Sequence, residues 1–353
     1  MLGDMGLNWE PDILGEGYRC LTLDLGEDDE GPLAATLVGF TPDPVAERPG
    51  ERLRRTLRGL LPGTRRDPEP VHAVIYVHGW ADYFFHTELA EFFAGHGMSF
   101  YALDLRKYGR SLREGQTEGF VNDLSEYDAD LEAAMAAVRL DLRNRLGPQV
   151  PVRISLMAHS TGGLVASLWA HRNPGRIEAL ILNSPWLELR GSSMVRGAAA
   201  GLLEPLARMR PKARLVLPEL DFYWRSISRE ADGEWDPHPV WKPRMSFPVR
   251  AGWITAVLAG HAQVAKGLDI QVPILLLASA RSTIAAKWTP DMTETDSVLD
   301  VSAMVQRGLL LGPEVTVFRF DGALHDVLLS ARPVRELVYT RMGRWLDGFI
   351  PRP

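Results

Sequence analysis

Short, mostly apolar runs alternate with segments of helical periodicity along much of the chain. Residues 72–77 (HAVIYV) and 152–158 (VRISLMA) are typical of strands buried on both faces, whereas 87–97 repeats apolar residues every three or four positions. Strands separated by helices need crossover connections, which give parallel pairing. The pattern therefore predicts an α/β fold with a mostly parallel central sheet flanked by helices. The further strands predicted are 98–104, 176–185, 272–279 and 315–320.

The clearest predicted helix covers residues 125–147. Ser125 with Asp128 suits an N-terminal cap, and Gly147 suits the far end. Helical spacing predicts that one side of this helix faces the core. That side consists of Tyr127, Leu131, Ala134, Met135, Val138 and Leu142.

Two regions depart from this rhythm. Residues 18–41 read as two strands around an acidic turn, and the stretch after them carries seven arginines between Arg48 and Arg66. We interpret the arginine-rich stretch as a solvated connector. Residues 186–268 show no clean strand–helix alternation, yet they hold half of the ten tryptophans. This insertion is expected to be a cap over a site, or a segment whose aromatic residues pack a small core of its own; both can hold.

These patterns predict four parts of one chain. Residues 1–70 supply the N-terminal strands and connector, 71–185 the first part of the α/β core, 186–268 the cap insertion, and 269–353 the second part of the core. A length of 353 residues suits a single α/β domain with an insertion.

Composition and charge narrow the possible functions. With 46% hydrophobic and 24% charged residues the chain is that of a folded soluble protein, and a net charge of −6 argues against nucleic acid as a partner. Cys20 is the only cysteine, which excludes an intramolecular disulfide and cysteine-rich zinc sites. The N-terminus lacks the basic start and apolar core of a signal peptide, and no apolar run reaches the roughly 18 residues of a transmembrane segment. We expect a cytoplasmic protein; its oligomeric state is left open.

Ser160 stands where a predicted strand meets a predicted helix, in the sequence AHSTGG. A nucleophile elbow has the form small-x-Ser-x-Gly, because the turn is too tight for large residues two positions before or after the serine. Ala158 and Gly162 satisfy this rule, although alanine replaces the usual first glycine. The alternative is a serine that only caps the helix.

Two further loops suit the same chemistry. A serine hydroxyl needs a base that is held by an acid, and in this kind of fold the chain order is serine, acid, histidine. His325 follows the last predicted strand, where that base is expected. The backbone N–H groups of Trp80, after the strand at 72–77, and of Thr161 are the expected oxyanion donors. The spacing of His78, His86 and His159 fits no recognised zinc pattern.

The ordered motifs HGWADYFFH, YALDLRKYGRS, AHSTGG and GALHDV resemble the α/β-hydrolase superfamily, within it the monoglyceride lipase, lysophospholipase and S33-type serine hydrolase group. The resemblance covers residues 72–185 and 272–349 well, and the insertion and the first 70 residues poorly. It implies an α/β-hydrolase fold with an inserted cap. Lys107 is a departure, because a glycine is frequent at its place in that group's D-x-x-G-x-G-x-S loop.

The identity of the acid rests on the resemblance. DSVLDVSAM looks like the acid loop of this group, in which the first aspartate is catalytic and the second begins a helix. By that match Asp296 is the acid and Asp300 caps the helix, with Asp291 as a further candidate. Residues 280–295 are then an insertion before the acid.

The expected function is hydrolysis of a small-molecule carboxylic ester through an acyl-enzyme on Ser160, His325 and Asp296, with no cofactor and no metal. Monoacylglycerol, lysophospholipid and small-ester substrates are all open. Trp80, His159, Trp186 and Trp224 are the expected substrate-binding residues, with packing as the alternative for His159. The other functions considered are an S33-type peptidase or amidase, for which Glu219 and Asp221 are acidic candidates to hold an amine, an acyltransferase, a perhydrolase, and a ligand-binding relative.

Overall fold

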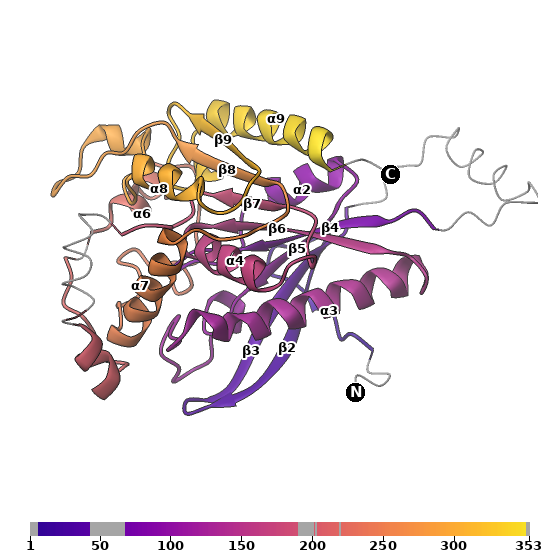
Figure 1. The fold of residues 1–353 in the computed structure, drawn as a ribbon, viewed down its shortest axis with the longest axis horizontal. Coiled ribbons are helices and arrows are strands. Elements are labelled where there is room, and N and C mark those ends of the chain that lie inside the picture. The colour runs from indigo at the N-terminus through magenta and orange to yellow at the C-terminus, as the bar shows by residue number, and fades with distance from the viewer. Residues whose placement is uncertain (1–5, 43–67, 190–200, 202, 219, 351–353) are drawn as a thin grey trace, which may run out of the picture.

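A computed structural model describes residues 6–42, 68–189, 201, 203–218 and 220–350. Within these residues one sheet has the strand order β1-β2-β3-β5-β4-β6-β7-β8-β9 (Figure 1). Pairing is parallel from β5 through β9, and β1 to β3 add antiparallel strands at one edge. The predicted mostly parallel sheet is therefore confirmed. The strands are β1 (Glu10–Pro11), β2 (Tyr18–Asp28), β3 (Gly31–Phe40), β4 (Val71–Val77), β5 (Ser99–Asp104), β6 (Val152–His159), β7 (Leu180–Asn183), β8 (Ile274–Ser279) and β9 (Val315–Phe320).

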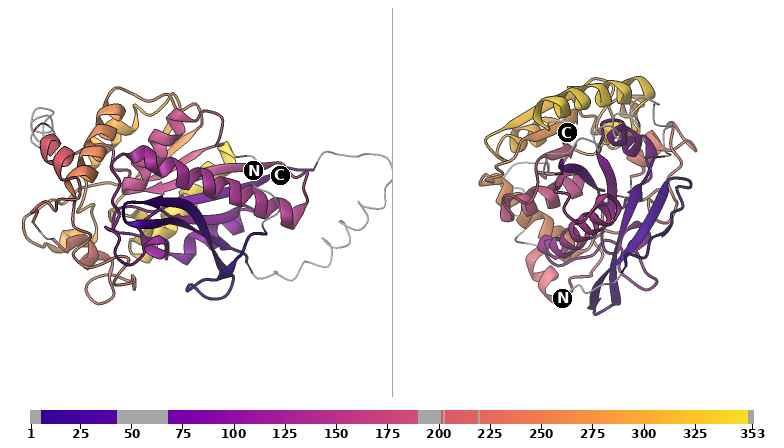
Figure 2. Two further views of the ribbon diagram at one scale, coloured as in Figure 1. Left: turned by 90° about the horizontal axis from the view of Figure 1, so that it is seen from below. Right: turned by 90° about the vertical axis from the view of Figure 1, so that its right-hand side faces the viewer.

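Helices cover both faces of the sheet (Figures 1 and 2). Phe93 of α2 and Met342 of α9 belong to the apolar core on one face, and Leu131 of α3 and Leu164 of α4 belong to the core on the other. In the described residues no helix is both long and apolar enough to cross a membrane. The helices are α2 (Thr87–Gly95), α3 (Tyr127–Leu146), α4 (Ser160–Arg172), α6 (Phe222–Ile227), α7 (Ala251–Ala265), α8 (Val301–Gly308) and α9 (Arg332–Phe349), with 3₁₀ turns η1 (Gly109–Ser111), η2 (Leu124–Glu126), η3 (Pro290–Thr293) and η4 (Val327–Leu329).

Helix α3 begins differently from the prediction. Asp123 caps the 3₁₀ turn that leads into it, and Glu126 closes a capping box by accepting from the Asp123 backbone N–H. Ser125 donates its own backbone N–H to Asp123, so it is not the cap. At the far end Gly147 has φ 119°, the conformation for which glycine was expected. All six residues of the predicted apolar side are buried.

The 186–268 segment contributes α6, α7 and a helical stretch at 203–209, which gather at one end of the sheet (Figure 2). Helix α7 does not pack a separate core, because Trp253 and Val257 join the main core beside α4. A Cβ on Gly260 would lie 3.0 Å from Leu168, so the two helices approach closely. The arginine-rich stretch 48–66 lies outside the described residues.

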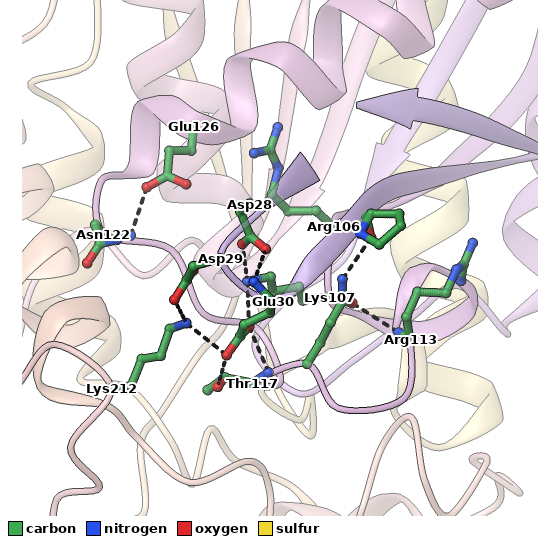
Figure 3. Close-up of polar contacts among 12 residues, drawn as sticks. Asp28, Asp29, Glu30, Arg106, Lys107, Arg113, Thr117, Asn122, Glu126 and Lys212 are labelled. Carbon is green, nitrogen blue, oxygen red and sulfur yellow. Dashed lines mark hydrogen bonds and ion pairs between the residues drawn. The ribbon is translucent and has the colours of Figure 1, made fainter. Parts of the chain in front are cut away.

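The acidic turn between β2 and β3 connects the core to this segment (Figure 3). Lys107 Nζ lies 2.6 Å from Asp28 and 2.7 Å from Glu30, and Lys212 Nζ of the 186–268 segment lies 2.9 Å from Glu30. Although burial acts to raise it, hydrogen bonds from Lys107 and Thr117 lower the pKa of Glu30 to about 2. The backbone of Lys107 has φ 61°, a value that glycine adopts readily. This explains why glycine is frequent at this place in the D-x-x-G-x-G-x-S loop of the group that the chain resembles.

Helix α4 starts in close contact with the end of β4. A Cβ on Gly162 would lie 2.2 Å from the carbonyl oxygen of His78 and 2.9 Å from that of Val77. A Cβ on Gly163 would lie 2.7 Å from Pro185. The two glycines after Ser160 are therefore required by packing, because any side chain would push α4 away from the sheet.

We expect Gly162→Ala to lower the free energy of unfolding by about 1–3 kcal/mol, because the new methyl group has no room beside His78. The matched control is Gly95→Ala at the end of α2, where a Cβ meets no atom within 4 Å. Urea unfolding of both variants measures the difference. Equal stability of the two would contradict the close approach of α4 to β4.

Candidate active site

Ser160 connects β6 to α4 in a strained conformation. Its φ is 51°, a left-handed value that costs a non-glycine residue of order 1–3 kcal/mol. The strand ends at His159 and the helix begins at Ser160 itself, so the turn has no spare residue. This geometry presents the Ser160 hydroxyl at the carboxyl edge of the sheet.

The structure brings Ser160, His325 and Asp296 together. His325 Nε2 lies 3.0 Å from Ser160 Oγ, and His325 Nδ1 lies 2.9 Å from Asp296 Oδ2. All three side chains are largely buried, and Asp296 has no exposed surface. With a proton on Nδ1, the imidazole donates to Asp296 and offers Nε2 to the serine hydroxyl. This is the hydrogen-bonded order of nucleophile, base and acid that a serine hydrolase needs.

The two aspartates of DSVLDV, Asp296 and Asp300, make different contacts. The other oxygen of Asp296, Oδ1, accepts the backbone N–H groups of Val298 and Leu299 at 2.8 and 2.7 Å, which orients the carboxylate. Asp300 caps α8 by accepting from the Ala303 N–H. Asp291 lies in η3, away from this hydrogen-bonded order.

A second set of contacts fixes the loop that carries His325. Asn183, at the end of β7, donates from its side chain to Asp326 Oδ1 at 2.6 Å and accepts the Val327 N–H at 3.2 Å. Asp326 Oδ1 also accepts the Leu328 N–H. The sequence reasoning missed Asn183 and Asp326. The adjacency of Asp326 to His325 was the available signal; nothing in the sequence pointed to Asn183.

His159 is buried beside His325. Its Nδ1 lies 3.1 Å from the carbonyl oxygen of Asn183, and its ring centroid is 4.9 Å from that of His325. Only 2% of its surface is exposed. Burial, followed by the nearby His325, lowers the pKa of His159 to about 3. The side chain is therefore neutral, and its placement fits the packing alternative.

The loop after β4 lies directly against the serine. A Cβ on Gly79 would be 3.0 Å from both the Ser160 Cβ and the His159 ring. The Trp80 backbone N–H has no hydrogen-bond acceptor within the described part of the chain. Thr161 occupies the first turn of α4, where backbone N–H groups lack acceptors within the helix. Both amides thus occur in the elements that flank Ser160.

Aromatic side chains flank this centre on one side. The Trp186 backbone N–H donates to the Ser160 carbonyl at 2.9 Å. Trp253 of α7 contacts both Trp186 and Trp80, at centroid distances of 6.0 and 3.7 Å. In the described residues Trp224 makes no ring contact with this group; its ring lies 5.1 Å from the Arg244 guanidinium.

Tyr223, the neighbour of Trp224 on α6, is the residue that reaches the site. Successive helical residues point about 100° apart, so the two rings leave α6 in different directions. The Tyr223 ring meets the His325 ring edge to face, with centroids 5.4 Å apart. The sequence pattern gave no signal that distinguished Tyr223 from Trp224.

The histidines near the site are used in hydrogen bonding or packing. His78 contacts the Gly79 carbonyl through Nδ1 and accepts the Leu105 N–H through Nε2. His86 packs its ring against Tyr76. Across the described residues no group of three histidine, cysteine or acidic side chains is placed to share a metal ion.

Comparison with known proteins identifies a family and a set of similar folds. The family model Hydrolase_4, described as serine aminopeptidase, S33, matches residues 68–300. The Paleococcus ferrophilus monoacylglycerol lipase superposes with a TM-score of 0.55 at 19% identity, over 80% of this chain and 96% of that one. A soluble variant of the Saccharomyces cerevisiae monoglyceride lipase, in complex with a substrate analogue, gives 0.58 at 14% identity over 99% and 96%. A carboxyl esterase from Bacillus coagulans gives 0.58 at 14% identity over 94% and 99%. No curated protein matches the chain.

The depressed pKa of His159 makes folding sensitive to acid. Between about pH 6.5 and about pH 3 the unfolded chain binds a proton at this residue and the folded chain does not, so falling pH favours unfolding. As the pH falls from about 7 to about 5, we expect the free energy of unfolding to decrease less for His159→Asn than for the unsubstituted protein. Urea unfolding across this range measures it. An unchanged slope would show that His159 is protonated in the folded chain.

Proposed function

We propose that this chain, which belongs to the serine aminopeptidase S33 family of α/β hydrolases, is a serine hydrolase that cleaves carboxylic esters. The observation that carries the proposal is the hydrogen-bonded order from Ser160 through His325 to Asp296, with the serine held at φ 51°.

In the proposed reaction Ser160 Oγ attacks the ester carbonyl carbon while His325 Nε2 takes the hydroxyl proton. The carbonyl oxygen becomes an oxyanion, which the Trp80 and Thr161 N–H groups stabilise. The bond to the alkoxide leaving group then breaks, and His325 returns the proton to that oxygen. A water molecule then attacks the carbonyl carbon of the acyl-enzyme. His325 takes the proton of this water and returns it to Ser160 Oγ as the carboxylic acid is released. Asp296 holds the Nδ1 proton and stabilises the imidazolium of both steps.

An ester with an apolar acyl or aryl part suits the surroundings of Ser160. Trp80 and Trp186 are half-buried beside the serine, with Trp253 packed between them. We expect these indoles to offer apolar surface to the acyl or aryl part of the substrate. The similar folds named above include two monoglyceride lipases and a carboxyl esterase, which agrees with this substrate class.

The family description raises aminopeptidase activity as a second candidate. Such an enzyme needs a carboxylate to bind the substrate amine. Asp221 is engaged by Arg244 at 2.7 Å, and Asp82 by Lys242 at 2.7 Å. Glu219 lies outside the described residues. These pairings favour ester over peptide substrates. A ligand-binding relative would have no use for the contacts of His325 with Ser160 and Asp296.

The nucleophile can be tested directly. A fluorophosphonate probe should label the intact protein at Ser160, since it forms a stable bond to an activated serine hydroxyl. Ser160→Ala should reduce hydrolysis of p-nitrophenyl esters by about a thousand-fold or more while the fold is kept. Peptide mapping of the labelled protein gives the modified residue. Labelling at another serine would contradict the assignment.

The identity of the acid can be tested by a ranking of asparagine variants. Asp296→Asn should lower kcat by about ten-thousand-fold, because the amide cannot hold the required imidazole tautomer. Asp300→Asn is the matched control and should be nearly silent, because asparagine caps a helix about as well as aspartate. Rates with one p-nitrophenyl ester measure both. The reverse ranking would mean that the acid lies four residues later in the chain.

A further inference from the structure

A buried ion pair joins the 186–268 segment to the loop that follows β4. Lys242 Nζ lies 2.7 Å from Asp82 Oδ1, and the two side chains are 7% and 3% exposed. Asp82 stands two residues after Trp80 and also accepts the Tyr83 backbone N–H at 2.9 Å. Although burial acts to raise it, Lys242 lowers the pKa of Asp82 below its ordinary value. Asp82 is therefore a carboxylate, held beside the proposed oxyanion loop.

The ammonium group of Lys242 is enclosed by aromatic rings as well. It lies 5.2 Å from the centroid of Tyr223 and 5.8 Å from that of Phe85, both within the range of a cation–π contact. The Tyr223 ring is in turn edge to face with His325. A continuous series of contacts thus runs from Asp82 through Lys242 and Tyr223 to the imidazole of His325.

The ion pair is not needed merely to attach the segment to the core. The Trp235 indole N–H donates to the Leu329 carbonyl at 2.9 Å, and the His238 backbone N–H donates to the Tyr83 hydroxyl at 2.9 Å. Glu234 pairs with Arg335 of α9. A buried ion pair contributes little net stability, because desolvation of two charges offsets their attraction. What it fixes is position, since charge and hydrogen-bond geometry allow few arrangements.

We propose that Asp82 and Lys242 are positioning residues that hold Tyr223 against His325 and thereby keep the imidazole aligned between Ser160 and Asp296. The inference rests on the proposed function, because it assigns these residues to the same hydrolytic centre. Tyr223 restricts the ring of His325 through the edge-to-face contact.

The test compares variants in steady-state hydrolysis of a short p-nitrophenyl ester. In Asp82→Asn combined with Lys242→Met no buried charge is left unpaired, so the fold should be kept. We expect kcat to fall about tenfold with KM within about twofold, the signature of misaligned catalytic groups. Tyr223→Ala should give the same loss, and Tyr223→Phe, which keeps the ring, should restore nearly the full kcat. Glu234→Gln, which breaks another contact of the same segment, is the matched control and should keep kcat.

The combined variant decides whether the residues act as one unit. If Lys242 acts through Tyr223, adding Tyr223→Ala to the neutral pair should cost no more than either change alone. Additive losses, or a folded neutral pair with full kcat, would overturn the inference. If the variant with Asp82→Asn and Lys242→Met does not fold, equal kcat values for Tyr223→Ala and Tyr223→Phe are sufficient to overturn the inference. Failure of fluorophosphonate labelling in the unsubstituted protein would instead overturn the proposed function and this inference with it.

Discussion

The close approach of α4 to the end of β4 is the constraint on which the site depends. Only a hydrogen atom fits between Gly162 and the carbonyl oxygen of His78. With the helix this near, the chain must turn from β6 into α4 within one residue, and Ser160 takes up φ 51°. Gly79, the next residue after His78, packs directly on Ser160. The strained serine and the loop that carries Trp80 are therefore one packing unit, since neither can move without the other.

The order of the parallel strands brings His325 and Asp296 to this unit. Strands β6, β7, β8 and β9 are parallel neighbours, so the loops that follow them leave the same edge of the sheet. Asp296 follows β8 and His325 follows β9, whereas Ser160 follows β6. Strand β7 lies between β6 and β8 and supplies none of these three residues. Its last residue, Asn183, instead hydrogen-bonds to Asp326 in the loop after β9 and, through its carbonyl, contacts His159 before Ser160. The side chain and the carbonyl of Asn183 thus connect the loop after β9 to the end of β6.

Much of this arrangement could be predicted from sequence because local rules dominate it. Continuous apolar runs marked each parallel strand from β4 onward, and small residues around Ser160 marked the turn. Contacts made by side chains far apart in the chain carried no such signal. Nothing local distinguishes Tyr223 from Trp224, because both are aromatic residues in one helical turn and only the packing of α6 selects between them. Lys242 likewise reads as a surface lysine until the fold brings Asp82 to it. The cap before α3 is Asp123 and not Ser125, because a 3₁₀ turn precedes the helix. Apolar periodicity does not reveal such a turn.

The 186–268 segment contacts the loop after β4 at two residues. Trp253 packs on the indole of Trp80, and Lys242 pairs with Asp82. Ala81 stands between these contacts with φ 48°, a left-handed value that a non-glycine residue keeps only when its surroundings enforce it. One apolar and one ionic contact supply that enforcement on adjacent residues. Trp253 and Lys242, which make these contacts, lie more than 150 positions later in the chain than Trp80 and Asp82. The segment is therefore tied to the loop after β4 by one apolar and one ionic contact on the two residues that flank Ala81.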